Sequence, residues 1–216
     1  MEKVITVRGV GKASAKPDTA VLTLVLSALD VKYDAAMTIA EKQLDSVRQS
    51  FVENGFNKDD IKTVDFHVVA EKKSVHDKNG NYSTVFAGYR CSHTLKITFD
   101  FDARRLGKAL AAATACTAEP ELNIAFTVKD KTAVSAAVLE SAAKSAREKA
   151  EVLAAASGVK LGELVNIDYN FSEHGAASPT RFLACNADAG IAARSMEIEP
   201  EDVVATDSAA FTWTIE

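Results

Sequence analysis

Hydrophobic and polar positions alternate with a period of two near the start of the chain, the pattern of strands with one buried face. Residues 3–11 form the first such strand, which we expect to end in a bend at Gly9-Val-Gly11. Residues 21–27 form the second, with leucines at every other position. Because only a short stretch containing Pro17-Asp18 separates the two strands, we expect them to pair as a hairpin.

Three stretches have the longer period of amphipathic helices. The first begins at about Asp34 and ends before Gly55, a residue suited to the left-handed position after a helix. The second spans 102–117 and has an aspartate at its N-cap. The third spans about 132–157 and ends at Gly158. It carries ten alanines in 26 residues, which gives it strong helix propensity and a thin face.

Five more alternating stretches predict strands, at residues 61–74, 84–100, 122–128, 161–171 and 202–215. The first two flank Asn79-Gly80, the residue pair typical of a type I′ hairpin turn. The resulting order, ββαββαβαββ, predicts an α+β fold with antiparallel sheets packed against three helices. Segment 172–200 has no clear period and is expected to be a long irregular loop, of the kind used for function or for contacts. No linker is visible, so we expect a single domain over residues 1–216.

The composition of the chain mainly excludes classes of function. With 25 Lys and Arg against 30 Asp and Glu, the net charge is −5, so we expect no nucleic-acid partner. No stretch reaches 18 consecutive apolar residues, so we expect no membrane-spanning helix. The first residues lack a signal-peptide pattern, and Cys91, Cys116 and Cys185 have no CxxC spacing. We therefore expect a cytoplasmic protein with free thiols, the alternative being the periplasm or cell envelope if an export signal has been removed.

Cys91 and His93 are the main candidates for chemistry. They lie two residues apart on one strand face, and a thiol and an imidazole together could bind a metal ion or react. Their apolar neighbours favour two buried structural residues instead. Asp65 and His67 have the same spacing on the preceding strand and could orient one another, although we expect both to face water.

Two further motifs favour structural interpretations. Ser141-Ala-Ala-Lys144 has the spacing found in serine acylases, but it lies in the middle of a helix and lacks the partner motifs of those enzymes. Gly9-Val-Gly11 lacks the rest of a nucleotide-binding fingerprint. We therefore expect no catalytic residues, no cofactor and no metal ion.

Three stretches together resemble the SIMPL-domain (YggE-like) family. They are residues 6–20, with the pattern V-x-G-x-G followed by P-D-x-A; residues 86–90, with a Gly-Tyr pair before a long strand; and residues 146–162, with A-R-x-K-A and G-V-x-L-G. The matched positions are Gly9, Gly11, Pro17, Asp18, Gly88, Tyr89, Arg147, Gly158 and Gly162. The three stretches occur in the family's order and cover essentially the whole chain.

The resemblance implies a non-enzymatic protein with no agreed catalytic residues. Bacterial members are linked to the cell envelope and to oxidative-stress defence, and some assemble into rings or channel-like oligomers. We therefore expect a self-associating homo-oligomer, with a ring as one form, in a stress-protective or structural role. One alternative is an adaptor that presents segment 172–200 to a protein partner, as an animal relative acts in kinase signalling. Another is a small hydrolase or redox protein that uses Cys91 and His93.

Overall fold

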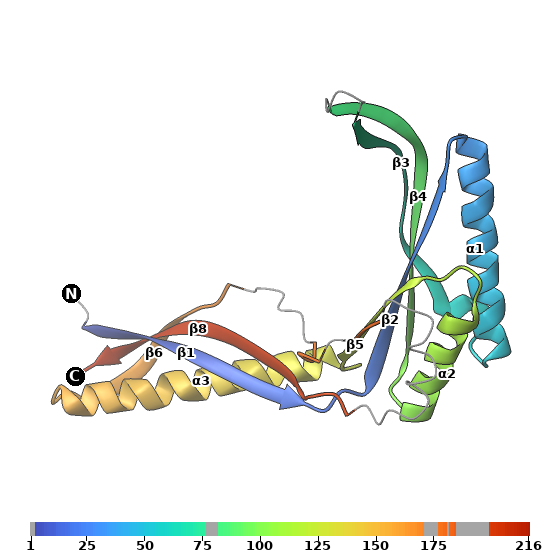
Figure 1. The fold of residues 1–216 in the computed structure, drawn as a ribbon. Coiled ribbons are helices and arrows are strands. Elements are labelled where there is room, and N and C mark those ends of the chain that lie inside the picture. The colour runs from blue at the N-terminus through green and yellow to red at the C-terminus, as the bar shows by residue number, and fades with distance from the viewer. Residues whose placement is uncertain (1–2, 77–81, 171–176, 181, 185–198) are drawn as a thin grey trace. The chain divides into compact units, whose positions relative to one another are not determined.

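A computed structural model describes residues 3–76, 82–170, 177–180, 182–184 and 199–216. It contains three α-helices and two antiparallel sheets, which confirms the predicted α+β class and the order ββαββαβαββ (Figure 1). A further three-residue strand, β7 (Phe182–Ala184), lies within the segment expected to be irregular.

The chain forms two compact units. The α3 unit comprises Met1–Asp18, Phe126–Pro179 and Pro200–Glu216, and the α1–α2 unit comprises Thr19–Ala125 and Thr180–Glu199. Each unit has its own hydrophobic cluster. That the whole chain acts as a single domain stays a prediction.

The α3 unit is a three-stranded sheet with one long helix along it (Figure 1). The strand order is β1 (Val4–Ala15), β8 (Val203–Ile215), β6 (Leu161–Asp168). Helix α3 (Lys131–Ala156) begins where Asp130 accepts a hydrogen bond from the main-chain N–H of Ala133 (2.8 Å). It ends before Gly158, whose φ is +72°, as the sequence predicts.

Helix α3 approaches β1 closely because two side chains are missing. A Cβ on Gly9 would overlap the carbonyl oxygen of Ala142, and one on Gly11 would overlap that of Val138. The helix side of this contact steps by four residues and is mostly alanine: Val134, Val138, Ala142, Ala146, Ala150 and Ala154. The predicted bend at the glycines is wrong, because β1 continues through both and stays paired with β8.

The predicted hairpin between the first two strands is also wrong. β1 pairs with β8, whereas β2 (Thr19–Asp30) pairs with β4 (Tyr82–Asp100). The residues between β1 and β2 have no positive φ, which a tight hairpin turn needs. Asp18 is held instead by the end of β5 (Glu121–Thr127): its N–H donates to the carbonyl of Thr127 (3.2 Å), and its carboxylate accepts from the N–H of Lys129 (2.8 Å).

The α1–α2 unit is a five-stranded sheet in the order β3 (Ile61–His76), β4, β2, β5, β7. Its helices are α1 (Tyr33–Glu53) and α2 (Ala103–Ala115), with a short 3₁₀ turn, η1 (Lys58–Asp60), before β3. Large side chains fill its core: Leu22, Leu24, Leu26, Phe51, Leu95, Ile97, Leu106 and Ile124. The predicted Asp102 cap is confirmed by a bond from the N–H of Arg105 (2.9 Å), and Gly55 after α1 has a φ of +88°.

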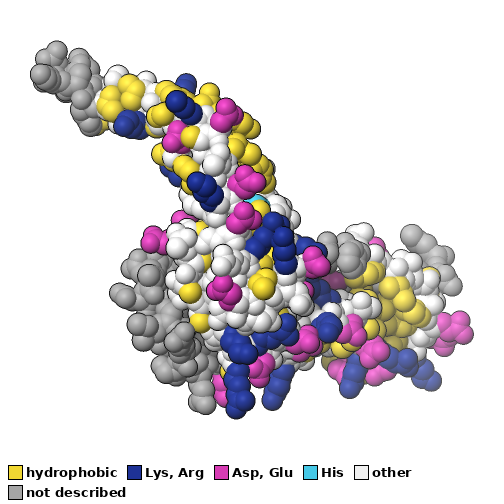
Figure 2. All heavy atoms as spheres, turned by 90° about the vertical axis from the view of Figure 1, so that its right-hand side faces the viewer, with side chains coloured by type: hydrophobic (Ala, Val, Ile, Leu, Met, Phe, Trp, Pro, Cys, Tyr) yellow, Lys and Arg dark blue, Asp and Glu magenta, His cyan; other side chains and the backbone are white. Residues whose placement is uncertain are grey.

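The β3–β4 hairpin is confirmed and extends beyond the sheet. β2 pairs with β4 only from Tyr89 onward, so residues 72–76 and 82–86 pair with each other alone, and we call them the β3–β4 arm. Its Asn79-Gly80 turn lies outside the described residues. Ala87 is an extra residue at the base of the arm, and this bulge interrupts the clean alternation that the sequence predicts there. Hydrophobic and charged side chains are interspersed along the arm (Figure 2).

Part of segment 172–200 is attached to the ends of strands. Ala177 forms a bridge with Thr127, and β7 pairs with residues 122–124 of β5. The predicted loop otherwise falls mostly outside the described residues. Within the described part of the chain, no helix is both long enough and apolar enough to cross a membrane.

Candidate functional site

Cys91 and His93 both point from β4 into the core of the α1–α2 unit. Cys91 is buried, as its apolar neighbours predict, and it packs with Ala28 of β2 and Ala40 of α1, so it lacks the access that metal binding or thiol reactivity would need. The Nε2 of His93 lies 2.8 Å from the hydroxyl of Thr63, and its ring meets Phe66 edge to face. Among the described residues, no group of three or more His, Cys, Asp or Glu side chains is placed to hold a metal ion.

The surroundings of Cys91 and His93 favour their uncharged forms. Burial raises the pKa of the Cys91 thiol. Burial also lowers the pKa of His93, and the positive charge of Arg48 on α1 lowers it further. Because the thiolate is the reactive form of cysteine, a thiol with a raised pKa is a poor nucleophile and a poor metal ligand at neutral pH.

The other sequence candidates are a solvent-exposed pair and a structural hydroxyl. Asp65 and His67 both have side chains that are more than half exposed, as expected, and they are joined by a 2.8 Å contact between Oδ2 and Nδ1. The Ser141 hydroxyl accepts a bond from the N–H of Lys12 (3.3 Å). Ser141 therefore helps to hold α3 against β1, a role different from that of an acylase nucleophile.

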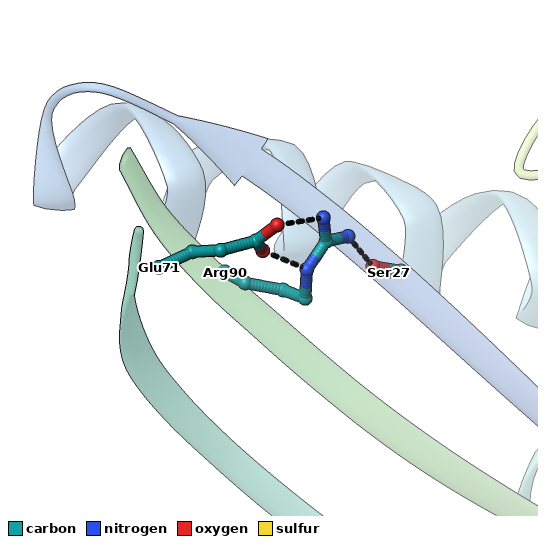
Figure 3. Close-up of polar contacts among 3 residues, drawn as sticks. All are labelled: Ser27, Glu71 and Arg90. Carbon is teal, nitrogen blue, oxygen red and sulfur yellow. Dashed lines mark hydrogen bonds and ion pairs between the residues drawn. The ribbon is translucent and has the colours of Figure 1, made fainter. Parts of the chain in front are cut away.

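A polar cluster that the sequence analysis missed spans three strands of the α1–α2 sheet (Figure 3). The guanidinium of Arg90 on β4 forms a two-pronged ion pair with Glu71 on β3, in which Nη2 donates to Oε1 (3.0 Å) and Nε donates to Oε2. Its Nη1 donates to the hydroxyl of Ser27 on β2 (2.7 Å).

The chemistry of the Arg90 cluster suits it to hold three strands together. The hydrogen bond from Arg90 lowers the pKa of Glu71, and the same bond raises the pKa of Arg90. Both groups therefore stay charged near neutral pH, so neither is suited to donate or accept a proton in catalysis. The sequence places Arg90 within a family motif, but the Glu71 partner depends on the bulge at Ala87, which local alternation does not reveal.

The α3 unit carries an open cavity of about 680 Å³ along β1, β8 and the end of β6. Its polar lining includes Arg8, Asp168 and Ser208. Arg8 donates to the hydroxyl of Ser208 from both Nη2 (2.7 Å) and Nε (3.1 Å). The Ser208 hydroxyl is therefore already engaged, and none of the described lining residues is a histidine that could activate it as a nucleophile.

Comparison with protein families gives one decisive match. A family model named SIMPL, described as a protein of unknown function (DUF541), matches residues 5–213. The chain belongs to the SIMPL family. No curated protein matches it. One solved structure that it resembles is the regulatory subunit of aspartate kinase from Thermus flavus, with 12% identity over 98% of this chain and 89% of that chain, at a TM-score of 0.16. That TM-score is too low to inform the fold or the function.

Four of the five glycines of the SIMPL motifs are tightly packed, and the fifth, Gly158, has the positive φ of a residue that follows a helix. Besides Gly9 and Gly11, Gly88 has a φ of +149°, and a Cβ there would lie 2.6 Å from the carbonyl oxygen of Asp30. A Cβ on Gly162 would overlap the hydroxyl of Thr214.

The remaining SIMPL motif residues also make structural contacts. The ring of Tyr89 meets Tyr33 and Phe86 edge to face, with centroids 5.6 and 5.3 Å apart. Arg147 forms an exposed ion pair with Glu151, one turn further along α3 (3.0 Å). Pro17 precedes Asp18 in the link held by β5. The motif residues therefore make structural contacts in this chain, and the family description assigns no activity.

Proposed function

We propose that this SIMPL protein is a non-enzymatic protein that assembles with copies of itself, in a structural or stress-protective role. The observation that carries the proposal is the β3–β4 arm, a two-stranded ribbon with apolar side chains in solvent. Tyr82 is 76% exposed and Phe86 is 49% exposed.

Within the described residues, the two strands of the arm have only each other as hydrogen-bonded strand neighbours. Isolated two-stranded ribbons are marginally stable in water, whereas ribbons packed on another surface bury their apolar side chains. The apolar residues lie among charged ones on the arm, as in contact surfaces that also remain soluble (Figure 2). A second protein surface would therefore stabilise the arm, and an identical copy carries such a surface in its own arm.

The non-enzymatic part of the proposal rests on how the polar groups are used. Cys91 and His93 are buried and favour their neutral forms, Glu71 is paired with Arg90, and Ser141 is bonded to the main chain of β1. As a compartment we propose the cytoplasm, with the periplasm as the alternative, because Cys91 and Cys116 are free thiols.

Light scattering coupled to size-exclusion chromatography tests the assembly. We expect a native mass that is a multiple of 23.0 kDa at micromolar concentration. The double variant Tyr82→Ser, Phe86→Ser should lower that mass. Val152→Ser is the control, because it removes an apolar side chain of intermediate exposure (68%) from α3. A wild-type monomer throughout the concentration range would overturn the proposal.

A second candidate is an adaptor that presents segment 172–200 to another protein. It is favoured by the way the described parts of this segment are attached: Ser178 is buried and its N–H donates to the carbonyl of Phe126 (2.8 Å), while β7 pairs with β5. A pull-down with and without residues 185–198 tests this candidate. Loss of specific partners on deletion supports the adaptor, and an unchanged set of partners argues against it.

A further inference from the structure

The outer edge of β3 is a long and regular strand edge. β3 is the last strand of its sheet, and within the described ranges β4 is its only hydrogen-bonded neighbour. β3 has an extra residue at Val64, and the bulge at the base of the arm belongs to β4. From Asp65 to Lys73, β3 therefore has no bulge of its own, and nine consecutive residues present an unbroken edge of the kind that recruits another strand.

We propose that this edge pairs antiparallel with the same edge of a second copy, about a two-fold axis through Val69. This inference rests on the proposed self-association, and it identifies the β3 edge as the surface through which two copies associate. In this register the residue numbers of each facing pair add up to 138, and a two-fold axis perpendicular to the sheet keeps facing residues on the same side.

Charge complementarity on one side of the strand supports this register. Asp65 faces Lys73 of the second copy, and His67 faces Glu71 of the second copy. Val69, which is 47% exposed, meets its own copy at the axis. Each charged pair occurs twice because of the symmetry, so four oppositely charged or hydrogen-bonding pairs flank one apolar contact.

The side chains on the other side of β3 are also compatible with this register. Phe66, which is 44% exposed, faces Lys72 of the second copy, whose aliphatic stem and ammonium group can cover an aromatic ring. Val68 faces Ala70 of the second copy. The exposed part of the Phe66 side chain would be covered by the neighbouring copy.

Neighbouring registers are disfavoured. An axis through Val68 places Asp65 opposite Glu71, which brings two carboxylates together. An axis through Ala70 removes every pair of a carboxylate and a cation from this side of the strand. Charged edges commonly prevent strand pairing, but here the signs follow a self-complementary order that permits one pairing and opposes its neighbours.

The Arg90 cluster fixes the position of one of the facing groups, the Glu71 carboxylate. Arg90 already holds the Glu71 carboxylate in place on β3 (Figure 3), so little side-chain freedom remains to be lost when His67 of the second copy approaches. In the assembled pair, Arg90, Glu71 and His67 of the second copy would form one continuous polar row.

Charge exchange provides the test. Asp65 and Lys73 are eight residues apart, about 26 Å along one strand, so they cannot touch within a chain. D65K would place two lysines opposite each other, K73D would place two aspartates opposite each other, and the double variant D65K/K73D would restore opposite charges. We expect each single variant to at least halve the native mass measured by light scattering and the double variant to recover the wild-type mass.

Control variants distinguish failure of the proposed pairing surface, of the register and of self-association itself. K96D changes the charge by the same amount on the neighbouring strand β4 and should leave the mass unchanged, and circular dichroism verifies that each variant is folded. An unchanged mass in both single variants would overturn pairing through β3 while leaving self-association intact. A double variant as small as the single ones would overturn the proposed register. A monomeric wild type would overturn the proposed function itself.

Discussion

The two units pack helices against a sheet in opposite ways. In the α3 unit, a helix lies on a strand because Gly9, Gly11 and a row of alanines leave almost no side chain between them. In the α1–α2 unit, buried leucine, isoleucine and phenylalanine side chains fill the space between helices and sheet. The first interface should be sensitive to added atoms and the second to removed atoms, because close-packed interiors tolerate neither overlap nor voids.

Adding a side chain at Gly11 should have the largest effect. In Gly11→Val the new Cβ would overlap the carbonyl oxygen of Val138, so α3 must move away from β1. We expect a loss of more than about 4 kcal/mol in the free energy of unfolding, the range of exceptional core disruptions. Denaturant titration followed by the fluorescence of Trp213, the single tryptophan and a core residue of this unit, measures it.

Gly107→Ala is the matched control for that experiment. A Cβ on Gly107 in α2 meets nothing within 4 Å, so the substitution should stabilise the protein by about 0.5–1 kcal/mol through helix propensity. Gly11→Val and Gly107→Ala with equal denaturation midpoints would contradict the distinction between the two interfaces.

Removing a side chain from the α1–α2 core should have the next largest effect. Leu24 on β2 is fully buried, so Leu24→Ala should lower the free energy of unfolding by about 2–5 kcal/mol through lost burial and an unfilled cavity. Far-UV circular dichroism during denaturant titration measures the change. The same deletion at Leu153, which is half exposed on α3, should change stability by no more than about 0.5 kcal/mol. Comparable losses at both positions would show that the large side chains do not carry this interface.

Protonation of His93 should produce a smaller, pH-dependent effect. Because the pKa of His93 is lowered in the folded state, the unfolded chain binds this proton more readily. Its contribution to stability is complete above the unfolded pKa of about 6.5 and is lost as the pH falls below that value. The denaturation midpoint of the wild type should therefore decrease between pH 7.5 and 5.5, and that of His93→Gln should decrease less. A His93→Gln slope as steep as that of the wild type would oppose the assignment to His93.

The Glu71–Arg90 pair should contribute least to stability, because both side chains are about one-third exposed. The pKa of Glu71 is lowered in the folded state, so its contribution is present above the unfolded value of about 4.5 and disappears as the pH falls through the lower folded value. A double-mutant cycle of Glu71→Gln and Arg90→Gln should show a favourable coupling at pH 7 that weakens as the pH falls below about 4.5. A coupling that does not change at any acidic pH at which the protein stays folded would mean that the pair is not ionic.

The sequence could predict the elements because their signals are local. The alternation of Leu22, Leu24 and Leu26 specifies a strand, and Asp102 and Gly158 mark the ends of helices within a few residues of where they lie. Strand pairing is not local: β1 selects β8, almost 200 residues away, and no periodicity encodes that choice. For the same reason the sequence predicts a bend at Gly9-Val-Gly11, whereas both glycines allow the close approach of α3 to β1.

The candidate site likewise combines features that local sequence reveals with features that depend on tertiary packing. Alternation places Cys91 and His93 on one face and their apolar neighbours predict that both are buried, as they are. The Glu71 partner of Arg90 and the self-complementary edge of β3 both depend on which residues carry bulges. Bulges arise from tertiary packing and leave little trace in the hydrophobic pattern.

Hydrogen exchange at increasing protein concentration tests self-association through β3 most directly. Pairing of the β3 edge would protect those amides of residues 65–73 that do not bond to β4. We predict that exchange in this stretch slows several-fold as the concentration rises from nanomolar to tens of micromolar, whereas exchange in β6, the outer strand of the other sheet, does not change. Equal exchange rates for residues 65–73 at all concentrations would contradict the account.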